Sequence, residues 1–161
     1  MMRGMVEEGV DAFIARFKAH ACDVQLASRY EGSPLLECFA GDLVLYLFER
    51  TNPYHAASGR ARVIVHPEAA SCTRLDADDP APARTVESVG ASALSVSGVV
   101  DVREDPFLIV DAGVRLVVAV DALPAELAVG DRVRFESRAP VHGFVLPPER
   151  GGAHVATDDL V

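Results

Sequence analysis

The sequence predicts a mainly β protein that begins with one helix and continues as two related, small, barrel-like units. Three observations support this fold class. Apolar residues recur at helical spacing near the N-terminus, short alternating runs broken by turn residues follow, and the order of these runs in the first half recurs in the second. A chain of 161 residues is long enough for one ordinary domain or two very small ones.

Residues 6–20 predict the helix. Its apolar side chains recur at spacings of four, three and four, which makes one stripe: Val6, Val10, Phe13 and Phe17. Acidic residues lie in the first turns and Lys18 and His20 in the last, a charge order that suits the helix dipole. We therefore expect the N-terminal segment, residues 1–22, to pack on a sheet or to close one end of a barrel.

Residues 23–67 predict the first β unit. Strand-like runs occupy residues 23–30, 35–39, 43–49 and 60–66, and the turn Ala40-Gly41-Asp42 joins two of them. Residues 68–92 contain Pro80 and Pro82 and show little hydrophobic periodicity, so we interpret this segment as a linker or a long connection.

The pattern of residues 93–147 predicts a second β unit, and that of residues 148–161 predicts a mobile tail. Val133 and Phe135 alternate with charged residues, which indicates a strand with one buried face. Gly98 lies in the middle of a first strand, where it allows the sharp coil of a small barrel. With a crossing segment before the fourth strand, residues 95–144 resemble an OB-type five-stranded barrel. This resemblance implies a fold and no function, because OB-type folds carry many functions.

The two units align without gaps at an offset of 72 residues, with eight identities over the 39 positions from 24 to 62. The turns agree as well. Both units place proline before the second strand, Ala-Gly in the following hairpin and Arg-x-Arg on the fourth strand. We interpret this pattern as an internal duplication. The alternative is convergence of two β-meanders that have similar turn spacing.

Charge and apolar patterning disfavour nucleic acid and membranes as partners. The net charge is −9, spread evenly, with 8 basic and 12 acidic residues in positions 1–80 and 7 and 12 in positions 81–161. Binding to phosphates depends on clustered Lys and Arg, which this chain lacks. No apolar run approaches the length of a membrane span, and the N-terminal residues carry no apolar signal region. We expect a cytoplasmic protein.

The reactive residue types form no recognisable catalytic or metal-binding motif. Cys22, Cys38 and Cys72 include no Cys-x-x-Cys pair, and the nearest histidine arrangement is a single His-x-Cys at residues 20–22. No nucleophile motif accompanies them. We therefore expect no metal site and no cofactor, and we favour a protein that is not an enzyme.

Two loops and two strands are the candidate binding elements. The loop with Tyr54 and His55 and the segment with His142 and Phe144 would form a rim for a ligand or partner. On the fourth strand of the second unit, Arg132 and Arg134 would add charge. Residues 43–48 are apolar on both faces, so that this strand would be covered on both sides. We expect Leu43, Leu45 and Leu47 to mark a self-association strand.

These features predict a non-catalytic binding module that acts on a protein partner or forms a homo-oligomer. Two alternatives stay open. The first is an OB-type binder of single-stranded nucleic acid, which needs exposed aromatic rings among basic residues. The second is a small-molecule-binding barrel, or a small enzyme, that uses His55 or His142 at the rim.

Overall fold

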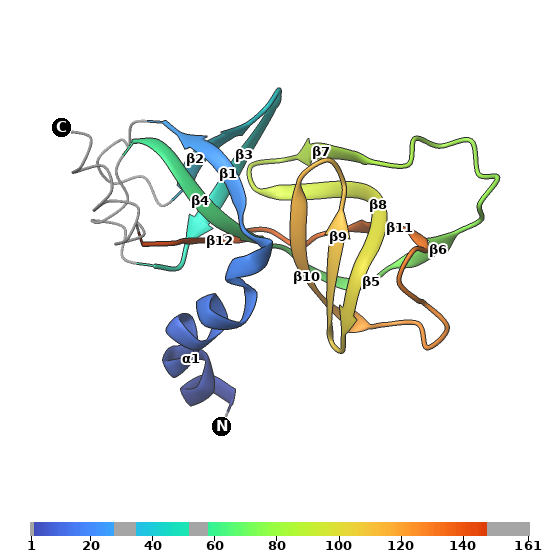
Figure 1. Cartoon of the computed structure of the whole chain (residues 1–161), viewed down its shortest axis with the longest axis horizontal. Coiled ribbons are helices and arrows are strands. Elements are labelled where there is room, and N and C mark those ends of the chain that lie inside the picture. The colour runs from blue at the N-terminus through green and yellow to red at the C-terminus, as the bar shows by residue number, and fades with distance from the viewer. Residues whose placement is uncertain (1, 28–34, 52–57, 148–161) are drawn as a thin grey trace, which may run out of the picture.

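The computed structural model describes residues 2–27, 35–51 and 58–147, with side chains from residue 9 onward. It is mainly β with one N-terminal helix, as the sequence predicts (Figure 1). The helix α1 (Met2–Phe17) leads through a 3-10 turn, η1 (Lys18–His20), into the strands. These are β1 (Cys22–Leu26), β2 (Leu35–Ala40), β3 (Leu43–Glu49), β4 (Gly59–His66), β5 (Glu68–Ser71), β6 (Thr73–Leu75), β7 (Thr85–Val89), β8 (Ala93–Glu104), β9 (Phe107–Asp111), β10 (Arg115–Ala122), β11 (Arg132–Glu136) and β12 (Val141–Val145).

The first barrel is a closed ring of five strands. β1, β2 and β3 form an antiparallel meander, and β4 pairs antiparallel with β1. β12 fills the gap between β3 and β4, parallel to the former and antiparallel to the latter. Every strand of the ring therefore has a hydrogen-bonded neighbour on each side.

The second barrel repeats this order of neighbours. β8, β9 and β10 form its antiparallel meander, and β11 pairs antiparallel with β8. β5 lies parallel to β10, and β6, which follows β5 after one residue, lies antiparallel to β11. Counted together, β5 and β6 are the fifth strand. β7 adds to the free edge of β8, outside the ring.

The two barrels exchange their fifth strands. After β4 the chain crosses into the second barrel as β5 and β6, and after β11 it returns to the first barrel as β12. Figure 1 shows β12, in red, running beside β4 in the first barrel. Residues 68–92, expected to be a linker, thus contain three strands, and β12 lies apart from the unit of residues 93–147 to which we assigned it. Strands this short show too little alternation to be recognised, and partners distant in sequence hold them.

One continuous apolar core fills both barrels, because inward side chains of the two meet where the strands cross. Leu47 of β3 and Leu116 of β10 belong to this cluster, and both are fully buried. Gly98 has no room for a side chain, since a Cβ there would lie 2.5 Å from Val110 Cγ1 and 2.8 Å from the Asp111 carbonyl oxygen. The mid-strand glycine expected from the sequence is therefore required by the close approach of β9.

The C-terminal half of α1 packs on the outside of the sheet, at the junction of the barrels. Phe17 is 2% exposed, and the ring of Phe13 stacks on Phe144 of β12 with centroids 4.5 Å apart. Ile64 of β4, together with Ile109 and Val117 on the outer faces of β9 and β10, completes this second apolar cluster. The helix thus covers the outer face of the β9–β10 hairpin and the neighbouring parts of β4 and β12.

Candidate functional site

The outer face of the β2–β3 hairpin carries three aromatic rings, which we call the aromatic stripe: Phe39, Tyr46 and Phe48. Side chains alternate across each strand, so that the neighbours Cys38, Leu45 and Leu47 point into the core. The register places Phe39 opposite Val44 and diagonally next to Tyr46, which precedes Phe48 by two residues on the same face. The three rings therefore form one continuous patch.

The stripe is the main exposed apolar feature of the described residues. Phe39, Tyr46 and Phe48 are 37%, 39% and 38% exposed, and the other large exposed hydrophobic residues in the described part of the chain are Val89 and Val129. Most of the remaining apolar side chains lie in the two clusters. Contiguous exposed apolar surface of this kind marks interaction sites in folded proteins.

Polar groups border the stripe on two sides. The Tyr46 hydroxyl donates a hydrogen bond to Glu37 Oε2 at 3.3 Å, which places a carboxylate beside the rings. On the other side, Gln25 of β1 stands in register between Phe39 and Arg60 of β4. A ligand on this face would meet aromatic rings first, one carboxylate next and one guanidinium at the margin.

His142 lies at the edge of this face, and its ring is 5.9 Å from that of Phe48. Burial, and then the positive charge of Arg50, lower the pKa of His142 from 6.5. Arg50 Nη1 lies 3.4 Å from His142 Nδ1, a geometry that suits donation to a neutral ring. Phe144 is 4% exposed and stacks under α1, so it supports the fold and does not form a rim.

A second histidine, His66, is buried beside His142, opposite it on β4. Its Nδ1 lies 2.7 Å from the Val117 carbonyl oxygen, and burial lowers its pKa from 6.5. Both histidines are therefore neutral at pH 7, and His66 links β4 to β10. Among the described residues, no group of three or more His, Cys, Asp and Glu side chains is placed to hold a metal ion.

The two arginines expected to supply charge differ in their surroundings. Arg132 donates hydrogen bonds to the carbonyl oxygens of Asp76, Asp79 and Ala81, so it holds the loop after β6. Arg134 is exposed on β11, where its backbone pairs with β6 and β8. Both lie on the second barrel, and the aromatic stripe lies on the first.

The expected self-association strand is β3, and the structure places its leucines inside. Leu45 and Leu47 are 1% and 0% exposed, and Leu43 packs against the same core. The outward residues of β3 are the alternate ones, including Tyr46 and Phe48. An apolar strand does not reveal which face is inward, because a shift of one residue exchanges the faces. Tyr54 and His55 lie outside the described residues.

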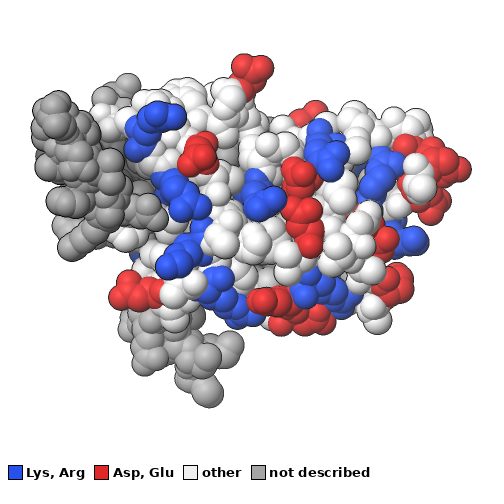
Figure 2. All heavy atoms as spheres, in the orientation of Figure 1, with Lys and Arg blue, Asp and Glu red and all other residues white. Residues whose placement is uncertain are grey.

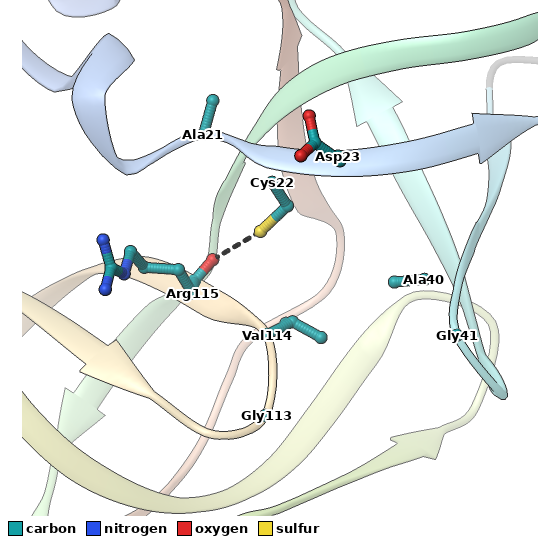
Figure 3. A pocket seen from close by; sticks show the side chains of 8 residues that line it. All are labelled: Ala21, Cys22, Asp23, Ala40, Gly41, Gly113, Val114 and Arg115. Atoms are coloured by element: carbon teal, nitrogen blue, oxygen red, sulfur yellow. Dashed lines mark hydrogen bonds between the residues drawn. The ribbon is translucent and has the colours of Figure 1, made fainter.

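A pocket of about 340 Å³ lies between the tips of two hairpins, one from each barrel (Figure 3). Gly41 and Gly113 belong to these tips, and Cys22 donates a hydrogen bond to the Arg115 carbonyl oxygen at 3.0 Å. Burial raises the pKa of Cys22 above 9.0, so this thiol is protonated at neutral pH. The lining holds no histidine, and a protonated thiol is a poor nucleophile, so this pocket offers no activated nucleophile.

The other cysteines are also buried thiols. Burial raises the pKa of Cys38 to about 12 and raises that of Cys72 from 9.0. All three cysteines are free. None of them has the electropositive, accessible surroundings that activate a thiolate.

Comparison of the chain with protein-family models, with curated proteins and with solved structures finds no match. Within the described part of the chain, no helix has the length and apolar character needed to cross a membrane.

Proposed function

We propose that this protein is a non-catalytic binding module that takes a protein partner on the aromatic stripe. The observation that carries the proposal is the exposure of Phe39, Tyr46 and Phe48 on one strand pair, next to a core in which alternate residues are fully buried. Aromatic residues are enriched at the centres of protein interfaces, and they contribute most of the binding energy there.

The charges near the stripe favour a protein over a nucleic acid. Glu37 accepts a hydrogen bond from Tyr46 at the border of the stripe, and a carboxylate there repels phosphate. The net charge of −9 acts in the same direction. Figure 2 shows Lys and Arg interspersed with Asp and Glu over one face of the molecule. Three free cysteines fit a reducing compartment, and we propose that the protein is cytoplasmic.

We also propose that both barrels are OB-type units that arose by duplication. Strand order supports this proposal, because each ring has its first strand between the second and fourth and its fifth between the third and fourth. The registers of the first and fourth strands correspond only after a shift of two residues: Val24 pairs with Ala61 in one barrel, and Gly98 pairs with Val133 in the other. This correspondence matches Val24 with Gly98, two residues away from its ungapped match, Val96. OB-type barrels bind ligands on their second and third strands, where the aromatic stripe lies.

Replacing the stripe tests the proposed function. The variant Tyr46→Ser with Phe48→Ser removes two exposed rings, and Val129→Ser, at a position 62% exposed elsewhere, is the matched control. We expect the wild type and the control to retain their partner in co-purification from the native host, or to self-associate in sedimentation velocity, and the double variant to lose it. Equal retention by the double variant would overturn the proposal.

One observation favours a second candidate, the binding of single-stranded nucleic acid. Three exposed rings on neighbouring strands could stack with bases, and Arg60 lies in the same row as Phe39. Fluorescence anisotropy with labelled oligo-dT and oligo-U decides between the two. Salt-sensitive binding that both Tyr46→Ser and Arg60→Gln weaken would favour nucleic acid, and no binding would favour a protein partner.

A further inference from the structure

We infer that the occupant of the aromatic stripe is an amphipathic α-helix of a partner protein, an inference that rests on the binding function proposed above. The chain itself shows how such a face is covered. β9 and β10 hold the same places in the second barrel as β2 and β3 hold in the first. The outer face of the β9–β10 hairpin is covered by α1, whereas that of β2–β3 is exposed.

Equivalent positions of the two hairpins make the comparison specific. Ile109 and Val117 are opposite each other on β9 and β10, and they are 2% and 0% exposed because α1 lies over them. Glu37 and Tyr46 are opposite each other at the equivalent place on β2 and β3. Tyr46 there is 39% exposed. One face therefore has its helix, and the other is an exposed face that no helix of the described residues covers.

The contacts of α1 indicate the chemistry of the missing helix. Phe13 and Phe17 lie against the sheet, and Arg16 donates a hydrogen bond of 2.7 Å to Glu104 of β8. The guanidinium of Arg16 also lies 4.9 Å from the centre of the Phe107 ring. The first barrel offers Glu37 beside exposed rings, the same pairing of carboxylate and aromatic surface. A helix with an apolar stripe would cover the exposed rings, and an Arg or Lys at the margin of that stripe would pair with Glu37.

Within the described residues no second α-helix is available for this face, so we assign the occupant to another protein. In this chain α1 is held at the junction of the barrels, because Phe17 is 2% exposed beside Phe107 of β9 and Phe13 stacks on Phe144 of β12. Binding of an amphipathic helix in an apolar groove relies on side chains spaced three and four residues apart. The partner segment should therefore show that spacing, together with a basic residue close to the position that faces Glu37.

Photocrosslinking of the full chain in its native host tests the inference. Tyr46 is replaced by p-benzoylphenylalanine in one sample and Val129 in the control, and the crosslinked segment is sequenced. We expect Tyr46 to crosslink to a segment with helical apolar spacing. A synthetic peptide of that sequence should gain helical circular dichroism on binding the wild-type protein. Glu37→Lys should weaken the peptide about tenfold or more, as should Phe48→Ala, the loss expected for an interface anchor.

The possible outcomes distinguish failure of the helix inference from failure of the proposed protein-binding function. A crosslink from Tyr46 to an extended segment, to the stripe of a second copy or to nucleic acid would overturn the helix. An extended segment or a second copy would leave a protein-binding stripe in place. No crosslink from Tyr46 above the Val129 control would overturn both the helix and the proposed function.

Discussion

Truncation of two neighbouring residues of β3 should destabilise the protein to very different extents. Leu47 is 0% exposed, and the backbone of β12 closes over it, since a Cβ at Gly143 would lie 2.9 Å from Leu47 Cδ1. Leu47→Ala leaves a cavity between strands that are paired on both sides and cannot collapse. We expect the free energy of unfolding to fall by about 3–5 kcal/mol, the upper end of the range for Leu→Ala in protein cores, which corresponds to a fall in Tm of about 6–20 °C.

Phe48→Ala is the matched comparison, because Phe48 is 38% exposed and its neighbour is on the other face of the same strand. Phe48→Ala should lower the free energy of unfolding by about 1 kcal/mol, since much of the ring is already exposed to solvent in the folded state. Thermal and urea unfolding, followed by circular dichroism, measure both variants. Equal losses, or a greater loss for Phe48→Ala, would show that β3 presents the opposite face to the core and would refute the position of the stripe.

Three further predictions concern the core and its polar contacts. Because burial lowers the pKa of His66 from 6.5, the unfolded state takes up the proton first. Stability should therefore fall as the pH falls below 6.5, and urea unfolding of His66→Gln between pH 7.5 and 5 should show a smaller fall. Gly98→Ala should cost about 1–3 kcal/mol, because its methyl would meet backbone 2.8 Å away; an unchanged Tm would contradict that approach. Ser92 Oγ donates to the Tyr46 carbonyl oxygen and accepts from the buried Val141 amide. Ser92→Ala should lose about 1–3 kcal/mol, with Ser88→Ala, at an exposed serine beside β3, as the milder control in the same unfolding experiment.

The sequence contained enough information for the fold class and for part of the architecture. Helical spacing up to Phe17 and the turn at Ala40-Gly41 predict elements that the structure contains, and the structure confirms a mainly β chain with one N-terminal helix and a closed five-strand barrel. Such local patterns are visible because each depends on residues close in sequence.

The strand exchange could not be predicted, because it depends on contacts distant in sequence. From the sequence, β12 looks like the end of the second unit, and its pairings with β3 and β4, such as Gly143 with Val65, assign it to the first barrel. β5 shows the same dependence on distant contacts. It lies in the segment that we expected to be a linker, and its Ala69 pairs with Val120 of β10 in the second barrel. Nothing local in either segment distinguishes the two partners.

The candidate site was missed for a related reason. The run of residues 43–48 is apolar throughout, so the sequence indicated an unusual strand without its orientation. Within this run the aromatic residues alternate with the leucines, and the neighbouring strand carries a further aromatic residue, Phe39. That alternation, with ring residues on one face and leucines on the other, is the signal from which the stripe could have been found.

The exchange of fifth strands underlies every assignment of inner and outer faces, and cross-strand nuclear Overhauser effects test it most directly. We predict contacts between the backbone protons of Gly143 and Val65, and between those of Ala69 and Val120. Contacts from Gly143 to β10, with Ala69 beside β3, would show that each half of the chain closes its own barrel and would contradict the exchange.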